Sequence, residues 1–178
     1  VMDPSVMLGH NIFAFDIGYI RFRCKELRIK LAIGRGGGPV KFDMWESSKR
    51  VDGTQDIEYT NCHVFGRELA DTMFLSITHD ALKKFPSYGL KPIIRYLGLE
   101  KKDRTFVDAS LLWSYYQDFL AGSPDMWNKA KQYAIEDSDD ALTLFDTFIP
   151  AYFNIAQNVS KSFQGVVNSA TGSQINNI

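Results

Sequence analysis

Apolar residues near the start of the chain fall into two neighbouring stretches with different spacing. Residues 6–10 (VMLGH) form a short, mostly apolar run, which is typical of a buried strand. In residues 13–27 the apolar positions instead recur every three or four residues, as on one face of a helix: Phe13, Ile17, Ile20 and Cys24. Asn11 lies between the two stretches and is expected to be the N-cap of the helix. The pattern therefore predicts a strand that runs directly into a helix.

The middle of the chain alternates apolar and polar positions. Segments 40–47 and 56–66 alternate moderately, and the polar residues between them predict the turn of a β-hairpin. The glycine-rich run 34–39 (GRGGGP) is not followed by the Gly-Lys-Ser/Thr of a phosphate-binding loop, so we interpret it as a flexible turn. Residues 66–72 then lead into another helix, which Pro86 is expected to stop.

From Tyr88 onward the sequence predicts mainly helices. Their expected starting points carry a proline or a capping side chain: near Lys91, after Asp108 and after Ser123. The last of these helices is long, and Pro150 is expected to kink or end it. The polar segment 159–178 contains Gly and Ser and is interpreted as a linker.

These elements suit a single domain with one incomplete sheet. A chain of 178 residues with 45% apolar residues can bury a substantial core. We expect residues 1–158 to form this domain and residues 159–178 to lead out of it. A lone early strand needs partners, the first residue is Val rather than Met, and the last residues carry no stop signal. We therefore expect a fragment of a longer chain whose earlier strands lie upstream.

Charge and cysteine content narrow the class of protein. The 20 basic and 21 acidic residues give a net charge of −1, which argues against a stand-alone binder of duplex DNA but leaves room for a site that accepts a few nucleotides. Cys24 and Cys62 lack the spacing of metal ligands and are interpreted as reduced core thiols. The sequence contains no signal peptide or transmembrane pattern, so we expect an intracellular protein, cytoplasmic or virus-encoded, without a membrane partner.

Three side chains carry candidate chemistry. Asp16 lies among apolar and aromatic residues just after the predicted strand, where α/β proteins often place their sites. Tyr133 and Asp137 are four residues apart and share one face of the predicted long helix. Asp16 can also complement a helix dipole, and Tyr133 and Asp137 can also belong to an exposed acidic surface. Two carboxylates on separate elements, with a phenol nearby, nevertheless suit two divalent cations that act on a phosphodiester.

These residues also form two motifs that resemble those of a known family. Asn11, Phe15 and Asp16 match the Asn-x-x-x-Phe-Asp pattern of the second exonuclease motif of family B DNA polymerases. Tyr133 and Asp137 match Tyr-x-x-x-Asp, the third motif of that family. The segments GRELADTMFLS and SYGLKPIIRYLGLE between them, and the tail of the chain, are similar to connecting segments of the same polymerases. The resemblance therefore extends over nearly the whole chain.

The resemblance implies an α/β, RNase H-like exonuclease fold: a mixed sheet flanked by helices, with a β-hairpin insertion and with the N-terminal strands missing. It implies a 3′→5′ proofreading exonuclease that uses two Mg²⁺ or Mn²⁺ ions. Asp16 and Asp137 would be the metal ligands in this chain, and Tyr133 would align the attacking water. Asn11 and Phe15 would line the pocket for the 3′-terminal nucleotide. The implied partners are the single-stranded 3′ end of DNA and the polymerase domains of the same parent chain.

One motif of the family is not found where the family places it. The first motif, Asp-x-Glu, should precede the second, but no such pattern lies before Asn11. Residues 56–58 (DIE) match it by letter yet fall in the predicted hairpin, away from the expected site. With half of the expected ligands, these 178 residues alone should have little or no nuclease activity. Two other interpretations stay open: a non-catalytic structural module of a polymerase, and a stand-alone exonuclease of the same superfamily.

Overall fold

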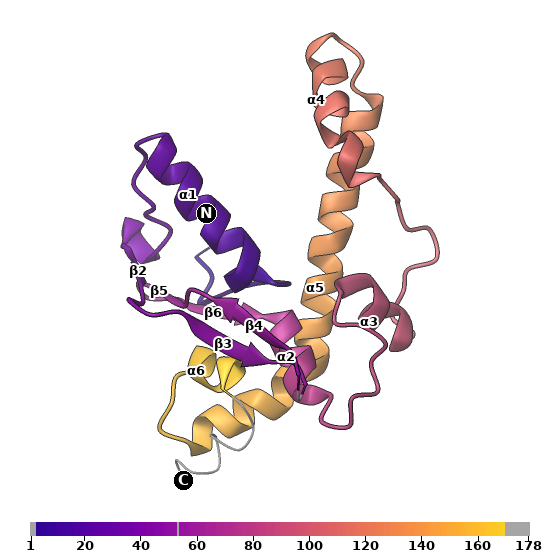
Figure 1. Cartoon of the computed structure of the whole chain (residues 1–178). Coiled ribbons are helices and arrows are strands. Elements are labelled where there is room, and N and C mark those ends of the chain that lie inside the picture. The colour runs from indigo at the N-terminus through magenta and orange to yellow at the C-terminus, as the bar shows by residue number, and fades with distance from the viewer. Residues whose placement is uncertain (1–2, 53, 170–178) are drawn as a thin grey trace.

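A pair of parallel strands organises the first half of the chain. The computed structural model describes residues 3–52 and 54–169, and Figure 1 shows how their elements are arranged. β1 (Val6–Gly9) is the strand expected from the first apolar run, and it pairs with β6 (Glu68–Asp71). Because the two strands run in the same direction, the segments that follow them leave from the same edge of the sheet.

The β-hairpin expected in the middle of the chain is present and consists of two antiparallel strand pairs. β2 (Val40–Phe42) pairs with β5 (Cys62–Val64), and β3 (Ser47–Arg50) pairs with β4 (Asp56–Tyr59). β3 occupies part of the expected turn. The turn stays short because the Asp52 carboxylate accepts two of its backbone N–H groups, at 2.7 and 2.9 Å.

Helices follow both parallel strands directly. After β1, a π-helical turn (Ile12–Asp16) continues into α1 (Ile17–Glu26), which is the helix predicted there. After β6, α2 (Thr72–His79) begins. It ends before Pro86, the residue predicted to stop it. The Asp80 carboxylate accepts two backbone N–H groups of the following segment, at 2.7 and 2.8 Å, and so stabilises a loop in place of further helix.

The second half of the described chain contains the three predicted helices: α3 (Leu90–Tyr96), α4 (Leu112–Leu120) and α5 (Asp125–Asn158). Asp108 is a cap, as predicted, because its carboxylate accepts the Ser110 N–H at 2.9 Å at the start of the turn that leads into α4. Ser123 is not the cap of α5. Pro124 already has helical backbone angles (φ −81°, ψ −11°), and this moves the N-cap position beyond Ser123.

α5 continues through Pro150, and its C-terminal part is held by packing. Pro150 removes one backbone N–H from the helix. Its neighbours Phe148 and Tyr152 are only 2% and 5% exposed, so the segment after the proline stays attached to the core. Figure 1 shows that α5 changes direction in its C-terminal part, as expected for a helix that contains a proline.

Part of the segment interpreted as a linker belongs to the core. α6 (Phe163–Asn168) buries Val166 and Val167 completely. The buried Gln164 side chain accepts a backbone N–H of β6 at 3.0 Å and donates to a carbonyl of β5 at 2.7 Å. The polar composition that indicated a linker therefore reflects side chains that bind strand backbone. The domain boundary at residue 158 stays a prediction, and residues 170–178 lie outside the described residues.

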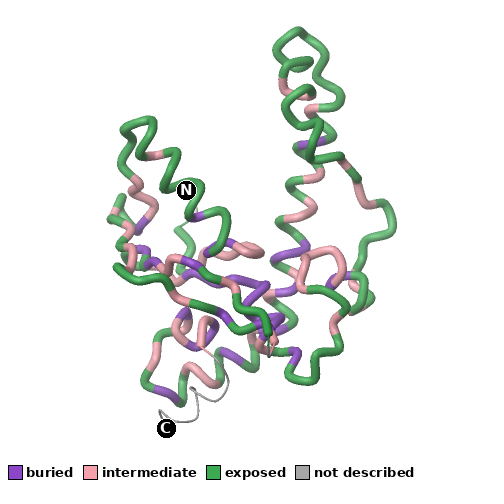
Figure 2. The backbone as a smooth tube through the Cα atoms, in the orientation of Figure 1, coloured by how far each residue is buried: buried purple, intermediate pink, exposed green. Residues whose placement is uncertain are grey.

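The core lies where the strands, α2, α6 and the C-terminal part of α5 meet (Figure 2). Several of its large apolar side chains are completely inaccessible to solvent: Phe74, Leu75, Ile93, Ile94 and Leu144. α1 and α4, by contrast, are exposed along most of their length. Most of the buried apolar side chains therefore lie around β1 and β6. The two exposed helices, α1 and α4, extend away from this core.

A buried lysine joins the hairpin to α6. Lys49 of β3 is 3% exposed. Its ammonium donates to the Thr78 hydroxyl at 2.7 Å and to three carbonyls at the end of α6, at 3.1, 3.4 and 3.2 Å: Val167, Asn168 and Ser169. The last carbonyls of a helix have no partner within the helix, so this cation satisfies groups that burial would otherwise leave unpaired.

Replacing Lys49 with Met should therefore destabilise the domain. Met has a similar length but no donor, so the carbonyls at the end of α6 would lose their partner, at a cost of about 3 kcal/mol. Urea denaturation, followed by circular dichroism, measures the free energy of unfolding. Lys41→Met, at an exposed position of β2, is the matched control and should change it by less than about 0.5 kcal/mol. Equal stabilities for the two variants would contradict a structural role for Lys49.

Candidate functional site

The corner between β1 and α1 has an unusual backbone. Asn11 has a left-handed conformation with φ of 66°, which Asn tolerates better than most residues. A side-chain N-cap requires an extended backbone at this position. Asn11 therefore holds the N-cap position, as predicted, but its side chain makes no capping hydrogen bond with any described residue. The π-helical turn that follows ends at Asp16.

Asp71, at the end of β6, holds this corner in place. Its side chain is completely buried. The carboxylate accepts the backbone N–H of Asn11 at 2.9 Å and that of Phe13 at 3.3 Å. It also accepts two N–H groups in the first turn of α2, from Met73 at 2.9 Å and Phe74 at 3.4 Å. One carboxylate thus joins the corner that carries Asp16 to the start of α2.

The neighbouring residue Thr72 reinforces the same junction. Its hydroxyl lies 3.2 Å from the Gly9 carbonyl and 3.0 Å from Nδ1 of His10. Nε2 of His10 donates to the Tyr88 carbonyl at 2.8 Å. Burial lowers the pKa of His10, so the ring is held as a neutral hydrogen-bonding group. His10 therefore has a structural role at this junction.

A cavity of about 580 Å³ brings the two candidate metal ligands together. Asp16 reaches it from the end of the π-helical turn, and Asp137 reaches it from α5. The other lining residues come from β1, the corner and α1 and, on the other side, from β6, α3 and α5. Partial burial raises the pKa of Asp16 above its ordinary value. The fold thus places two carboxylates that are far apart in the sequence on one cavity.

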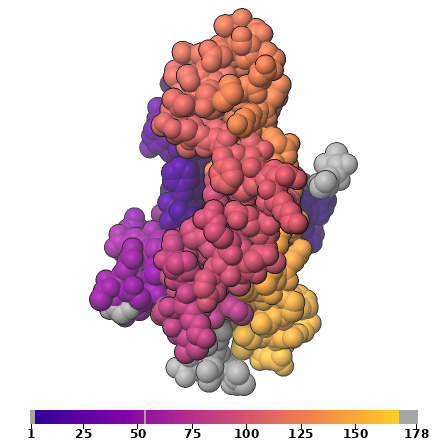
Figure 3. Space-filling model, turned by 90° about the vertical axis from the view of Figure 1, so that its right-hand side faces the viewer, coloured from indigo at the N-terminus to yellow at the C-terminus, as the bar shows by residue number. Residues whose placement is uncertain are grey.

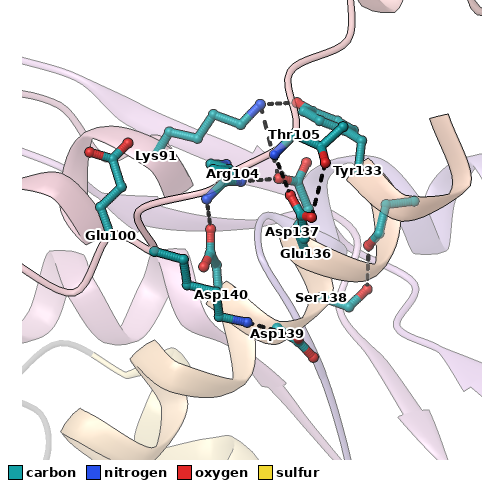
Figure 4. Close-up of polar contacts among 12 residues, drawn as sticks. Lys91, Glu100, Arg104, Thr105, Tyr133, Glu136, Asp137, Ser138, Asp139 and Asp140 are labelled. Atoms are coloured by element: carbon teal, nitrogen blue, oxygen red, sulfur yellow. Dashed lines mark hydrogen bonds and ion pairs between the residues drawn. The ribbon is translucent and has the colours of Figure 1, made fainter. Parts of the chain in front are cut away.

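Tyr133 and Asp137 share one face of α5, as their spacing predicted, and both contact Lys91 of α3 (Figure 4). The Lys91 ammonium donates to the Tyr133 hydroxyl and lies 4.0 Å from the centre of the Tyr133 ring. The same ammonium is 3.9 Å from Oδ1 of Asp137. Burial lowers the pKa of Lys91, whereas the negative charge of Asp137 opposes this change. Lys91 therefore links the phenol and the carboxylate of the third motif.

Arg104 binds the same helix from the segment between α3 and α4. Its side chain is 4% exposed and forms ion pairs with Asp137 and Asp140. Thr105 extends this attachment, because its N–H and hydroxyl donate to Glu136 at 2.7 and 3.0 Å. Figure 3 shows the segment between α3 and α4 covering much of one face of the molecule. The position of Asp140 on the helix face is visible in the sequence, but the loop residue Arg104 carries no pattern that marks it.

The two residues expected to contact the terminal nucleotide, Asn11 and Phe15, do not line this cavity. Asn11 lines a second cavity of about 580 Å³ together with residues of the 83–89 segment. Phe15 is 64% exposed and stacks on Tyr19, with 6.5 Å between the ring centres. Contacts of Asn11 and Phe15 with a nucleotide stay a prediction.

The described residues offer only part of a metal site. Asp56, in the DIE sequence, lies on β4 and pairs with Arg50 at 3.0 Å, which confirms that this match is part of the hairpin. Within residues 3–52 and 54–169, no group of three or more His, Cys, Asp or Glu side chains is placed to hold a metal ion. In the same ranges, no helix is both long and apolar enough to cross a membrane.

Asp71→Asn should reveal the energetic role of the buried carboxylate. Burial raises the pKa of Asp71 from 3.8 to about 6 against the effect of its four N–H donors. Between pH 3.8 and 6 the folded chain therefore binds more protons than the unfolded chain, and the contribution of Asp71 to the free energy of unfolding declines as pH rises. Asn cannot ionise, and its amide faces N–H donors. The variant should lose this decline and be less stable by about 1–3 kcal/mol.

Urea denaturation across this pH range measures both effects, and the difference between wild type and variant isolates Asp71 from other titrating groups. Asp118→Asn, at an exposed position of α4, is the control and should follow the wild type. A variant with wild-type stability and wild-type pH dependence would show that Asp71 does not hold the corner.

The relationship to known proteins agrees with this geometry. The family described as "DNA polymerase family B, exonuclease domain" matches residues 1–93, which include the corner, the hairpin, β6 and α2. A DNA polymerase of Thermococcus sp. (strain 9oN-7) is 22% identical over 97% of this chain and 20% of its own length. A DNA polymerase of Thermococcus kodakarensis is 21% identical over 97% of this chain and 9% of its own length.

A solved structure has a similar fold. The family B DNA polymerase from Pyrobaculum calidifontis matches 97% of this chain and 20% of its own, with a TM-score of 0.74 and 21% identity. The predicted α/β exonuclease fold is thereby confirmed. The chain spans a fifth or less of the length of these relatives. With more than half of its residues inside the family match, the chain belongs to the exonuclease-domain family of the family B DNA polymerases.

Proposed function

We propose that this exonuclease domain removes misincorporated nucleotides from the 3′ end of DNA in a family B DNA polymerase. The observation that carries the proposal is the common cavity of Asp16 and Asp137. These carboxylates belong to the two motifs of the resemblance, and they come from elements separated by most of the chain. A structural requirement of α1 or of α5 alone does not explain why both face one cavity.

The carboxylates that line the cavity are the type of ligand that a divalent cation requires. Asp16 and Asp137 offer carboxylate oxygens, the ligands that Mg²⁺ and Mn²⁺ prefer, and they would hold the ion in this chain. A bound ion would stabilise the negative charge that develops on the phosphodiester. Two carboxylates are half of the four that the family resemblance implies, so the complete pair of ions requires ligands beyond the described residues.

Tyr133 is suited to orient the attacking water. The ammonium of Lys91 has donors and no acceptor, so the Tyr133 oxygen accepts from it and keeps its own hydrogen for donation. The cation–π contact at 4.0 Å also restricts the ring. In the proposed mechanism Tyr133 donates a hydrogen bond to the water and holds it beside Asp137, so that the water is already positioned for attack.

Arg104 and Lys91 balance the negative charge of α5. Asp137 and Asp140 would repel one another without these cations, because both lie on one face of the helix. In the proposed mechanism the pairing holds the segment between α3 and α4 against the site. The same pairing also reduces the charge that Asp137 offers to a metal ion.

The proposed substrate is a single-stranded 3′ end, and the proposed partners are the polymerase domains of the same parent chain. Relatives in which this region is a fifth or less of a longer DNA polymerase support the second point. Asn11 and Phe15 directly precede Ile12 and Asp16, which line the cavity, and are the proposed contacts with the terminal nucleotide. Because this substrate is short, the near-neutral charge of the chain does not conflict with the proposal.

A second candidate function is that of a non-catalytic module that braces a polymerase. The ion pairs of Asp137 with Arg104 and Lys91 favour it, because a carboxylate retained for structure would have such partners. In that case the full-length chain would lack exonuclease activity, and Asp137→Ala would reduce only its stability.

Asp16→Ala in the full-length polymerase should abolish exonuclease activity and leave nucleotide incorporation unchanged, because only the exonuclease cavity loses a ligand. Degradation of a labelled single strand and extension of a primed template measure the two activities. Asp139→Ala is the matched control, since Asp139 is a half-exposed acid of α5 that pairs with Lys101 at 2.9 Å. Exonuclease activity that persists in Asp16→Ala would overturn the assignment of the site.

The 178 residues alone should degrade single-stranded DNA weakly or not at all with Mg²⁺ or Mn²⁺. Two carboxylates, one of them paired with two cations, make a weak site for divalent metals. The measurement is release of nucleotides from a 3′-labelled oligonucleotide, with the full-length polymerase as positive control. Robust metal-dependent 3′→5′ degradation by this chain would show that the site is complete without further carboxylates.

A further inference from the structure

α1 is anchored at its start and exposed along the rest of its length. Ile17 is buried, whereas the residues that follow are exposed, apart from the half-buried Cys24. Figure 1 shows α1 extending away from the strands. A helix of this length, about 15 Å, gains little stability from its own hydrogen bonds. The residues on its outer side are therefore candidates for contact with a ligand.

Three exposed aromatic side chains lie along this outer side. Phe15, Tyr19 and Phe22 are spaced four and three residues apart, and they are 64%, 58% and 54% exposed. The rings of Phe15 and Tyr19 are nearly parallel, with an angle of 6° and 6.5 Å between their centres. Arg23 lies four residues after Tyr19, and Lys25 lies three residues after Phe22. We call these five residues the outer face of α1, although Phe15 belongs to the π-helical turn that leads into the helix.

Positive charge is concentrated in the same segment. Residues 17–35 contain six basic residues and one acidic residue, Glu26, although the whole chain has a net charge of −1. Two of the six cations are engaged, since Arg21 lies over the Phe42 ring at 4.2 Å and Arg35 pairs with Asp3 at 3.1 Å. The others are exposed and form no ion pair with any described residue: Arg23, Lys25, Arg28 and Lys30.

The outer face of α1 begins at the candidate exonuclease cavity. Asp16, which lines that cavity, lies between Phe15 and Ile17 in the sequence, and Ile20 of α1 also lines it. A strand whose 3′ end occupies the cavity can leave it along α1. Flat apolar rings next to unpaired cations suit a ligand that alternates planar bases with single negative charges. An acidic protein segment would match the charge but not the stacked rings.

We propose that the outer face of α1 binds the single-stranded DNA adjoining the 3′ end, with bases stacked on Tyr19 and Phe22 and phosphates paired with Arg23 and Lys25. This inference rests on the proposed exonuclease function and extends it from the terminal nucleotide to the nucleotides that precede it. α1 then serves both to carry the corner with Asp16 and to guide the strand towards it.

Binding of a fluorescein-labelled oligothymidylate to the full-length polymerase, followed by fluorescence anisotropy in EDTA, tests the proposal without hydrolysis. Tyr19→Ala and Arg23→Glu should each weaken binding about tenfold. For Arg23→Glu the slope of log K against log salt should also fall by about 0.7 per lost phosphate contact. Phe153→Ala and Lys84→Glu are controls at exposed positions away from α1, and both should bind like the wild type.

Substrate length provides a second readout. In exonuclease assays Tyr19→Ala and Arg23→Glu should raise KM for the oligothymidylate and leave kcat unchanged. The same variants should hydrolyse a thymidine dinucleotide like the wild type, because a dinucleotide occupies the cavity without reaching the outer face of α1. A change in kcat for both substrates would instead indicate a disturbed corner and would overturn the proposal.

Two further outcomes would overturn the proposal. One is unchanged anisotropy and salt dependence in both variants. The other is a lower melting temperature of the full-length chain with unchanged DNA binding, which would assign the outer face of α1 to a contact with another protein segment. Failure of the proposed function is separately recognisable, because it would appear as persistent nuclease activity in Asp16→Ala, whereas the anisotropy measurement does not depend on cleavage.

Discussion

The buried carboxylate of Asp71 is the interaction on which the site depends. It accepts N–H groups from the corner after β1 and from the first turn of α2, and it has no access to solvent. A buried carboxylate is unfavourable unless its oxygens accept hydrogen bonds. Because the donors come from both the corner and α2, these hydrogen bonds hold the corner and the helix at fixed distances from one another. Asp16 is carried by that corner. Its place on the cavity therefore follows from a residue that has no contact with the cavity.

The other side of the site is governed by charge balance. α5 presents two carboxylates on one face, and the segment between α3 and α4 supplies Arg104 while α3 supplies Lys91. These contacts fix Tyr133 and Asp137 to the rest of the domain, because α5 is otherwise packed mainly through its C-terminal part. The site is thus built from a rigid corner and an ion-paired helix.

Local patterns predicted much of this arrangement. The period of the apolar residues identified β1 and α1, and the spacing of Tyr133 and Asp137 correctly placed both on one helix face. The motif that contains Asp16 was recognised from neighbours within a few residues. Asp71 caps α2 through its near neighbours Met73 and Phe74, but its bonds to the corner after β1 join residues far apart in the sequence. The partners of Arg104 are also far away in the sequence, so the local pattern predicts neither long-range contact. The sequence does not reveal the structural role of Lys49 either, because its hydrogen-bond partners lie on α2 and at the end of α6.

The order of the elements and the family resemblance can both be predicted from the amino-acid sequence. Both depend on local patterns, namely helical and strand periodicity, turn residues and short motifs, which involve residues close together in the chain. Asp16 and Asp137 meet at one cavity only because β1 pairs with β6 and α5 packs against β1. The burial of α6 likewise depends on backbone groups of β5 and β6 that its own polar sequence does not reveal. The shared cavity and the burial of α6 are therefore decided by the tertiary structure, because both depend on packing and on hydrogen bonds between residues far apart in the sequence.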